Sequence, residues 1–488
     1  MTGSTAIAFA LGLPLFGTIL ILLNHRYPNI REAITLLTAT CLLLIVVGML
    51  PEITSGGRPE LILFEMLPGL PIAFKVEPLG MLFALVASGL WLVTSVYSIG
   101  YMRGNNEERQ TRFYAFFAIS LSSVMGIAFS ANMLTLFIFY EVLTLATYPL
   151  VIHKEDKEAI SGGRTYLGIL IFTSVAFLLL GVVWTWFLTG TLDFTPGGIL
   201  KGKADGPVIG LLLFLYMYGT GKAALMPFHR WLPAAMVAPT PVSALLHAVA
   251  VVKAGVFTIV KVIVYIFGVD LLSTTAEASW LIYIAGATII IASLVALRQD
   301  NLKRRLAYST VSQLSYVIMA AAILTPISIM AAALHIAAHA VGKITLFFAA
   351  GSIYTAAHKT EISQMNGIGR RMPWTMCAFA IGTLSMIGLP PAGAFLSKWY
   401  MLQGALDSSQ WFPIAVIVLS TMLNTAYFVP IIYNAFMKPE DVAPAHEHGE
   451  APIWIVIALT TTAAGSILLF FMPGVGFDLA QQLAGAAK

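Results

Sequence analysis

Six ionisable side chains fall inside long apolar stretches of this sequence, where charged residues are rare. One is a carboxylate and five are amines: Glu141, Lys222, Lys253, Lys261, Lys343 and Lys398. A charged side chain at the centre of a lipid bilayer costs about 2.5–3.5 kcal/mol or more. Groups kept there pair with one another, face the interior of a helical bundle or touch water, and in those places they can relay protons. These residue types therefore indicate proton transfer through a membrane.

A lysine near the end of a membrane span has an alternative, because its long stem can extend the amine to the lipid headgroups. For Lys261, which lies close to the end of its apolar stretch, both interpretations stay open. For the other four lysines, burial in the interior is favoured.

Histidines extend this set of titratable groups. His335, His339 and Lys343 are spaced i, i+4, i+8, so they form one stripe on a helix, as expected along a hydrated proton path. Two histidines at i, i+4 can also share a metal ion, but no HExxH glutamate lies between them, and we predict neither a metal site nor a cofactor. His247 precedes Lys253 by six residues, so the two point to different sides of an ideal helix, which fits an interrupted one.

Prolines predict that two membrane helices are broken. Pro227 follows Lys222 by five residues, and Pro390-Pro391 precede Lys398. Proline removes a helical hydrogen bond, and the freed carbonyl then needs a protein or water partner in lipid. Broken helices at membrane depth tend to mark ion sites in transporters. The breaks lie five spans apart, and because five is odd, two five-helix units would be inverted relative to one another.

The whole chain has the composition of a polytopic membrane protein. Of its 488 residues, 58% are apolar and 10% charged, against about 25% charged in soluble domains. Its apolar runs are continuous and about 20 residues long, as all-α membrane spans require, and no convincing strand is recognised. We predict 14 spans, at roughly 5–23, 32–50, 79–101, 113–130, 132–152, 165–189, 207–228, 241–268, 278–297, 307–324, 327–356, 374–404, 411–437 and 452–472. A single turn signal, Ser130-Ala131-Asn132, separates the fourth span from the fifth.

The loops between these spans differ strongly in charge. Seventeen basic residues lie in the loops after odd-numbered spans, against five on the side that carries both termini. Basic loops stay in the cytoplasm. We therefore expect a prokaryotic cell membrane protein with both termini on the non-cytoplasmic side, and we interpret the N-terminal segment as a retained first span. The charged stretch 438–452 is predicted to be a solvated loop, and its His446 and His448 are assigned no metal.

Other classes of protein have little support. The net charge of +4 is spread over short loops, which argues against nucleic-acid binding. Cys41 and Cys377 lie in apolar runs, where we expect small buried thiols, and two distant cysteines cannot hold an iron–sulfur cluster. The segment GTGK at 219–222 is no Walker A motif, because position 216 is Tyr and two alanines follow Lys222. No catalytic centre is predicted in this chain.

Three long segments resemble one family of membrane proteins. They are GTGKAALMPFHRWLPAAMVAPTPVSALLHAVAVVKAGVF (219–257), DNLKRRLAYSTVSQLSYV (300–317) and GLPPAGAFLSKWYM (388–401). They are similar to the antiporter-like subunits shared by respiratory complex I, membrane-bound hydrogenases and multisubunit Mrp-type Na⁺/H⁺ antiporters. The resemblance covers roughly residues 70–435 and is closest to the D-type subunit of the Mrp antiporters.

This resemblance implies a fold of 14 helices, with two inverted five-helix repeats and with the seventh and twelfth helices broken. The corresponding boundaries are 1–111 for the first three helices, 112–268 and 277–437 for the repeats, and 438–488 for a loop and the last helix. It also implies that Glu141 pairs with Lys222, and that protons move through eighth-, eleventh- and twelfth-helix positions: His247, Lys253, His335, His339 and Lys398.

The resemblance further implies a proton-translocating subunit of a monovalent cation (Na⁺)/H⁺ antiporter, with other membrane subunits, H⁺, Na⁺ and the lipid bilayer as partners. The alternative is a proton-pumping membrane-arm subunit of a complex I-like NADH dehydrogenase or a membrane-bound hydrogenase. A carboxylate beside a buried amine favours the charged amine. Breaking or forming the pair of Glu141 with Lys222 would thus act as a switch that sends a proton toward Lys253, the histidines and Lys398.

Overall fold

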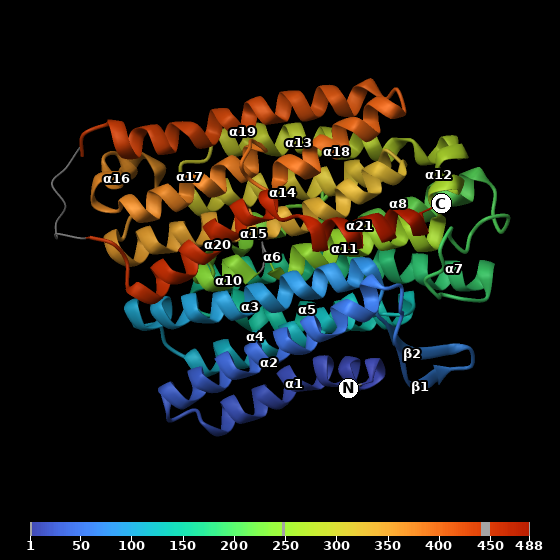
Figure 1. Cartoon of the computed structure of the whole chain (residues 1–488), viewed down its shortest axis with the longest axis horizontal. Helices are drawn as coiled ribbons and strands as arrows, with labels where there is room; N and C mark the ends of the chain where they lie inside the picture. The colour runs from blue at the N-terminus through green and yellow to red at the C-terminus, as the bar shows by residue number, and fades with distance from the viewer. Residues whose placement is uncertain (1, 246–248, 441–448, 488) are drawn as a thin grey trace.

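The computed structural model describes residues 2–245, 249–440 and 449–487, which form a bundle of roughly parallel helices (Figure 1). Three expectations fall outside these residues, namely those for His247, His446 and His448. The first five long helices are α1 (Gly3–Leu23), α2 (Pro28–Thr54), α3 (Pro78–Gly104), α4 (Gln110–Ala128) and α5 (Met133–Val151). The predicted turn separates α4 from α5, because the Asn132 side chain caps α5 by accepting a hydrogen bond from the Thr135 N–H.

The sixth span is one continuous helix with a π-helical segment, the seventh is interrupted, and the eighth is described on either side of residues 246–248. The sixth comprises α6 (Lys157–Thr173), η1 (Ser174–Leu179) and α7 (Leu180–Thr189). The seventh comprises α8 (Gly206–Gly219), the short turn η2 (Gly221–Ala223) and α9 (Trp231–Ala234), followed by η3 (Ala235–Val237). The eighth comprises α10 (Thr240–Ala244), α11 (Val251–Val262) and η5 (Ile263–Phe267).

The second half of the chain repeats this alternation of long and broken helices. A short α12 (Val269–Thr274) and η6 (Ala276–Ala278) lead into α13 (Trp280–Leu297), α14 (Leu302–Ala322) and α15 (Pro326–Ala357). After η7 (Ile362–Met365) and α16 (Ile368–Arg371), the twelfth span is divided into α17 (Pro373–Ile387) and α18 (Ala394–Asp407). The last helices are α19 (Trp411–Met437), α20 (Ile453–Phe471) and α21 (Gly474–Ala486). The predicted breaks at Pro227 and at Pro390-Pro391 are confirmed.

Ten helices in the described residues are long and apolar enough to cross a membrane. Of the other four predicted spans, the seventh and the twelfth are interrupted, and the eighth is described only on either side of residues 246–248. The fourth of these, α14, is rich in serine and carries three basic residues in its first turn. The prediction of an all-α polytopic membrane protein is confirmed. Both ends of the chain lie toward the end of the bundle that carries β1, β2 and α12, as an even number of crossings requires (Figure 1).

The expectation of a chain without strands is wrong. Strands β1 (Glu60–Leu67) and β2 (Leu70–Lys75) form an antiparallel hairpin between α2 and α3. The sequence signal was present, because Pro68-Gly69 is a turn dipeptide between two apolar runs too short to span a membrane. The end of the bundle that carries this hairpin is called the hairpin end.

The expectation that both cysteines are buried is also wrong. Cys377 is exposed and Cys41 is half-buried. Lipid is as apolar as a protein core, so an apolar run in a membrane helix predicts insertion in the bilayer and says nothing about which of its side chains face other helices.

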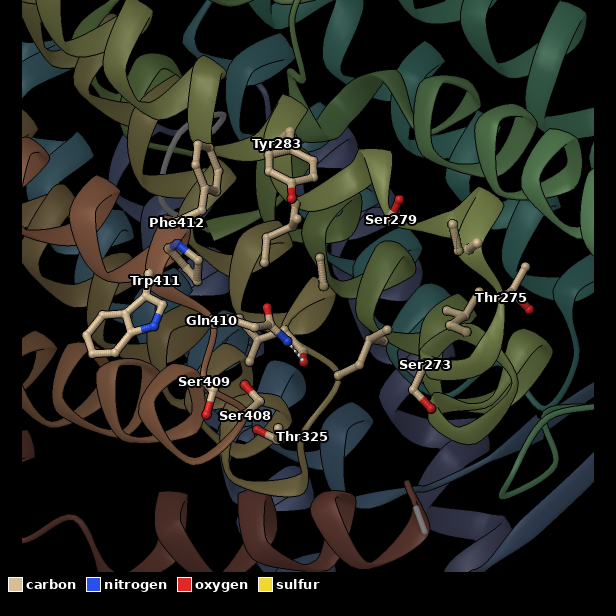
Figure 2. Close-up of a pocket in the computed structure, with 18 residues that line it drawn as sticks. Ser273, Thr275, Ser279, Tyr283, Thr325, Ser408, Ser409, Gln410, Trp411 and Phe412 are labelled. Atoms are coloured by element: carbon tan, nitrogen blue, oxygen red, sulfur yellow. Dashed lines mark hydrogen bonds between the residues drawn. The ribbon is translucent and has the colours of Figure 1, made fainter.

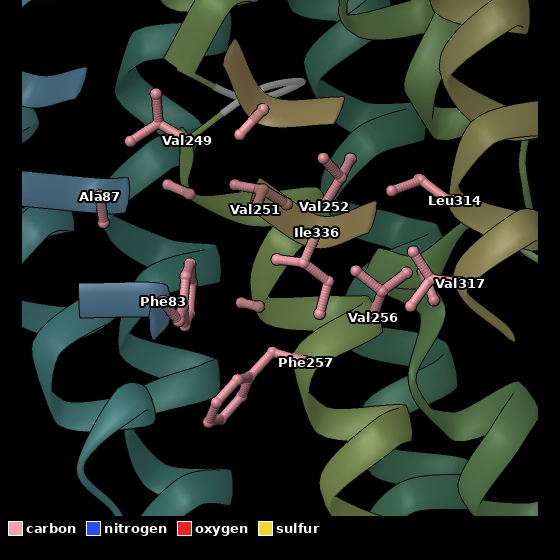
Figure 3. Packing of buried hydrophobic residues seen from close by; sticks show 14 of the residues in the cluster. Phe83, Ala87, Val249, Val251, Val252, Val256, Phe257, Leu314, Val317 and Ile336 are labelled. Carbon is pink, nitrogen blue, oxygen red and sulfur yellow. The ribbon is translucent and has the colours of Figure 1, made fainter. Parts of the chain in front are cut away.

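Among the ten helices long and apolar enough to cross a membrane, α15 is the most buried. It packs against α3, α11, α14, α17 and α18. Close packing of valine, leucine, isoleucine and phenylalanine side chains fills the space between α3, α11, α14 and α15 (Figure 3). Any polar group on these facing surfaces must find its partner within the protein.

Candidate functional site

The titratable side chains of the spans lie in the interior of the bundle. Exposure is zero for Lys222, Lys253, His335, His339 and Lys343, and 4% for Lys398. Burying an amine without a polar partner is costly, so each of these groups needs an acceptor. The partners that the fold supplies define the candidate site.

Lys222 lies in η2, within the break of the seventh span, and is bound to α5. Its Nζ donates to the Tyr140 carbonyl at 2.8 Å and to the Thr144 hydroxyl at 2.6 Å, and it lies 3.1 Å from the centre of the Tyr140 ring. The Lys222 backbone N–H donates to the Tyr140 hydroxyl at 3.1 Å. A charged amine is thus held by a carbonyl, a hydroxyl and an aromatic face.

Glu141 is the neighbouring carboxylate on α5. It interacts electrostatically with Lys222, but no ion pair among the described residues joins the two side chains. Its Oε1 is buried and has no hydrogen-bond partner within the described part of the chain. The carboxylate therefore acts on the amine from beyond ion-pair distance and keeps an unused acceptor.

Lys253 and His339 form the centre of the site. The Lys253 Nζ on α11 is hydrogen-bonded to Nδ1 of His339 on α15. Two residues beyond Lys253, Gly255 lets α11 approach η2, since a Cβ there would lie 2.5 Å from the Lys222 carbonyl carbon. The close approach brings the backbones that carry the two lysines together.

His335 continues the line from His339 along α15. Their rings are parallel, with centres 6.1 Å apart. The two ring nitrogens of His335 are hydrogen-bonded to Ser397 Oγ at 2.8 Å and to Gln313 Oε1 at 3.1 Å. The charges of Lys253, on one side, and of Lys398, on the other, both act electrostatically on His335.

Lys398 lies at the break of the twelfth span. Its Nζ donates to the carbonyls of Met386, at 3.1 Å, and Ile387, at 2.8 Å. The glycine between the two half-helices makes room for it: Gly388 has φ +85°, and a Cβ there would lie 2.5 Å from the Lys398 Cδ. The break therefore creates the site that the amine occupies.

Lys343 forms a side branch from this line. Its Nζ donates to Ser309 Oγ at 2.8 Å, and the same oxygen is hydrogen-bonded to the Tyr427 hydroxyl at 3.1 Å. Tyr427 is in turn hydrogen-bonded to Asn424. An electrostatic interaction joins Lys343 to Lys253.

Two interpretations of Lys261 were open, an amine that extends to the lipid headgroups and an amine buried in the bundle, and the burial of its side chain decides between them. Its side chain is 1% exposed, and its Nζ lies 3.1 Å from Glu77 Oε2 and donates to the Ser130 carbonyl at 2.6 Å. It therefore does not extend to the lipid headgroups.

Sequence reasoning missed the neutral polar partners of these amines, which are Tyr140, Thr144, Ser309, Gln313, Ser397 and Tyr427. A weak signal existed, because DNLKRRLAYSTVSQLSYV (300–317) places Ser309 and Gln313 four residues apart, on one face of α14. Hydroxyls and amides are too common in membrane helices to be recognised as partners without the tertiary contacts.

In the part of the chain that the structure describes, no three His, Cys, Asp or Glu side chains gather as metal ligands. A cavity of about 570 Å³ lies elsewhere, between α12, α13 and the start of α19, with serine, threonine and aromatic side chains around Gln410 (Figure 2). It has no lysine, histidine or carboxylate in its lining.

Comparison with known protein families gives two matches along the chain. Residues 130–424 match the family described as "NADH:quinone oxidoreductase/Mrp antiporter, TM". Residues 69–114 match "NADH-Ubiquinone oxidoreductase (complex I), chain 5 N-terminus". The first match covers more than half of the chain and nearly all of the site. The chain belongs to this family.

Several curated relatives agree with that membership. NADH-quinone oxidoreductase subunit N of Desulforudis audaxviator is 35% identical over 75% of this chain and 73% of its own length. Hydrogenase-4 component B of Escherichia coli is 30% identical, over 82% of this chain and 62% of its own length. The A/B subunit of a probable K⁺/H⁺ antiporter from Rhizobium meliloti is 28% identical, over 88% and 43%. This chain thus spans less than two thirds of the last two relatives.

Solved structures have the same fold. A chain of the membrane-bound sulfane sulfur reductase, an archaeal respiratory membrane complex, superposes with a TM-score of 0.86 at 24% identity, over 99% of this chain and 97% of that one. A chain of the Mrp complex from Dietzia sp. superposes with a TM-score of 0.84 at 19% identity, over 98% and 97%. At these identities the likeness demonstrates the architecture of the family.

Proposed function

We propose that this protein moves protons across a prokaryotic cell membrane as one subunit of a multisubunit monovalent cation (Na⁺)/H⁺ antiporter. The observation that carries the proposal is the row of buried titratable groups that crosses the bundle. From the fifth span to the twelfth, the row comprises half-buried Glu141 and the buried residues Lys222, Lys253, His339, His335 and Lys398. Neutral residues could stabilise such a bundle at lower cost, so a row of this kind supports a function in charge movement.

The first step of this mechanism belongs to Lys222. Its amine has two sets of acceptors within reach: the Tyr140 carbonyl with the Thr144 hydroxyl, and the nearby Glu141 carboxylate. When the amine faces the Glu141 carboxylate, its charged ammonium form is favoured. When the amine turns to the neutral acceptors instead, release of its proton is favoured. A turn of one side chain thereby changes the proton affinity of the amine.

The second step passes the proton along the centre of the bundle. When Lys253 is an ammonium, its hydrogen bond to Nδ1 of neutral His339 is the route by which the proton leaves the amine. His335 is the next titratable group, and Gln313 with Ser397 orients its ring. Lys398 ends the row, with Lys343 as a branch whose charge acts on Lys253. His247 belongs to this proposal from the sequence alone.

The two halves of the site support the proposed inverted repeats over 112–268 and 277–437. In each unit of five spans the fourth is broken, at η2 in the first and between α17 and α18 in the second. Each break holds a buried lysine, Lys222 or Lys398. Residues 1–111 and 438–488 would then flank the repeats, and the excess of basic residues in the loops supports termini on the non-cytoplasmic side.

The second candidate is a proton-pumping subunit of a redox-driven complex, either complex I-like or a membrane-bound hydrogenase. The match to the NADH-quinone oxidoreductase relative, at 35% identity over most of both chains, favours it. The resemblance of residues 219–257 and of Lys398 to the D-type subunit of Mrp complexes favours the antiporter. Both candidates use the same row of residues and differ in the partners that drive it.

Gentle purification of the native complex separates the two candidates. Small membrane subunits without flavin or iron–sulfur signals are expected for the antiporter, whereas redox subunits would overturn that assignment. The row itself is tested in membrane vesicles by Lys222→Ala and Glu141→Ala, with exposed Lys203→Ala as control. We expect at least a tenfold loss of proton transport in assembled complexes of the first two variants. Transport near the wild-type rate in Lys222→Ala would refute the mechanism.

A further inference from the structure

A buried ion pair between α11 and the start of α3 lies outside the proposed row of residues. Lys261, near the end of α11, lies 3.1 Å from Glu77, which directly precedes α3. The two side chains are 1% and 6% exposed. A buried ion pair is weak support for stability, because removing two charges from water costs about as much as their attraction returns. Its presence therefore calls for a functional explanation.

The pair is separated from the centre of the site by apolar side chains. Lys261 follows Lys253 by eight residues, which is about 12 Å along the helix axis. Midway between them, the Phe257 ring packs on Phe83 with ring centres 5.1 Å apart (Figure 3). The Lys261 Nζ lies 5.6 Å from the centre of the Phe257 ring and 4.1 Å from that of Phe194. Apolar constrictions of this kind block ions until they become wet.

On its other side the pair leads to the surface of the hairpin end. Two residues before Glu77, Lys75 on β2 interacts electrostatically with Lys261 and forms an ion pair with Glu60 at 2.7 Å. Lys75 and Glu60 are 32% and 56% exposed, so they meet water. The charged groups thus run from the surface inward to Lys261 and stop at the phenylalanines.

We propose that Glu77 and Lys261 form a proton-exchange site that connects the interior to the hairpin end, with Phe83 and Phe257 as the barrier between this site and Lys253. The inference rests on the proposed function. The Lys261 ammonium gives its proton to the Glu77 carboxylate, which leaves a neutral amine and a carboxylic acid. The acid loses the proton to water at the hairpin end, and the amine accepts another from the Lys253 ammonium when the barrier is wet.

The alternative is that the pair only fastens α3 to α11, which requires a permanent cation and nothing more. Lys261→Arg separates the two roles, because arginine keeps the charge and the hydrogen-bond donors but does not release a proton in proteins. We expect Lys261→Arg to assemble and to lose at least tenfold in proton transport in vesicles, and we expect the same of Lys253→Arg. Exposed Lys203→Arg is the matched control and should transport like the wild type.

Wild-type transport in assembled Lys261→Arg would overturn the inference and leave the proposed function intact. Wild-type transport in Lys253→Arg and Lys222→Ala as well would overturn both. Should the larger arginine prevent assembly, the double variant Glu77→Gln/Lys261→Met replaces the pair with neutral groups of similar size. An assembled double variant that does not transport supports the exchange site, and one that transports overturns it.

Discussion

The Lys398 ammonium lies 2.8 Å from the Ile387 carbonyl oxygen, which in an unbroken helix would accept the N–H of residue 391. Residue 391 is proline and has no N–H to donate to the Ile387 carbonyl. Residue 390 is also proline, so the Met386 carbonyl likewise lacks its helical donor. The ammonium donates to both carbonyls. Sequence elements that look like a helix breaker and a misplaced charge are therefore two parts of one structure.

Restoring the missing N–H groups should weaken this site. In the double variant Pro390→Ala/Pro391→Ala, the backbone can compete with Lys398 for the two carbonyls. We expect assembled complexes to lose about tenfold in proton transport, measured by the collapse of a pH gradient in vesicles. Pro51→Ala, at an exposed proline inside α2, is the control and should leave the rate unchanged. An equal rate in the double variant would contradict the role assigned to the break.

Removing one acceptor of Lys222 should change the first transfer step. Thr144→Val keeps the shape of the side chain and deletes the hydroxyl that accepts from the amine at 2.6 Å. Without it, the amine loses a neutral partner and spends more time beside Glu141, so we expect about a threefold to tenfold slower transport. Thr425→Val, at an exposed threonine of α19, serves as the control. A variant as fast as the wild type would show that Thr144 does not hold the amine during turnover.

Replacing His339 by glutamine tests whether that residue carries a proton or only a hydrogen bond. The glutamine side chain can accept a hydrogen bond from Lys253 but does not accept a proton near neutral pH. We expect His339→Gln to assemble and to lose at least tenfold in transport, whereas His25→Gln, at an exposed histidine, should have no effect. Normal transport in His339→Gln would assign His339 a structural role.

A histidine outside the spans predicts a pH dependence of stability. Burial lowers the pKa of His153, which follows α5, to about 4, and the charge of Arg112 acts in the same direction. The folded protein thus binds this proton more weakly than the unfolded chain, whose histidine has a pKa of about 6.5. The contribution of neutral His153 to the free energy of unfolding is complete above about pH 6.5 and is lost as the pH falls toward 4. At pH 5 the free energy of unfolding is lower by about 2 kcal/mol for this reason.

His153→Phe should remove this dependence. The ring of Phe113 already packs edge-on against that of His153, with centres 6.2 Å apart, so a phenyl group fits the place. Thermal unfolding of the solubilised protein at pH 7.5 and pH 5 measures the effect. We expect the melting temperature of the wild type to fall more between these pH values than that of His153→Phe. Equal falls would show that His153 is not protonated on unfolding in this range.

Local features of the sequence were sufficient for the broad architecture. Uninterrupted apolar runs predict membrane helices because every backbone group must be satisfied within the bilayer, and prolines at 227 and 390–391 predict breaks because they lack the N–H. The stripe of His335, His339 and Lys343 follows from helical spacing alone. The hairpin was missed because its apolar strands resemble pieces of a membrane span, although Pro68-Gly69 marks the turn.

Tertiary structure decided which groups meet. Glu77 and Lys261 are far apart in the sequence, as are Lys253 and His339, and each pair forms only because α3, α11 and α15 pack side by side. The same packing selected Tyr140 and Thr144 as acceptors for Lys222. The sequence alone shows that several amines lie within the bilayer and that each must find a polar partner there. The identity of each partner depends on contacts between helices, which no local pattern encodes.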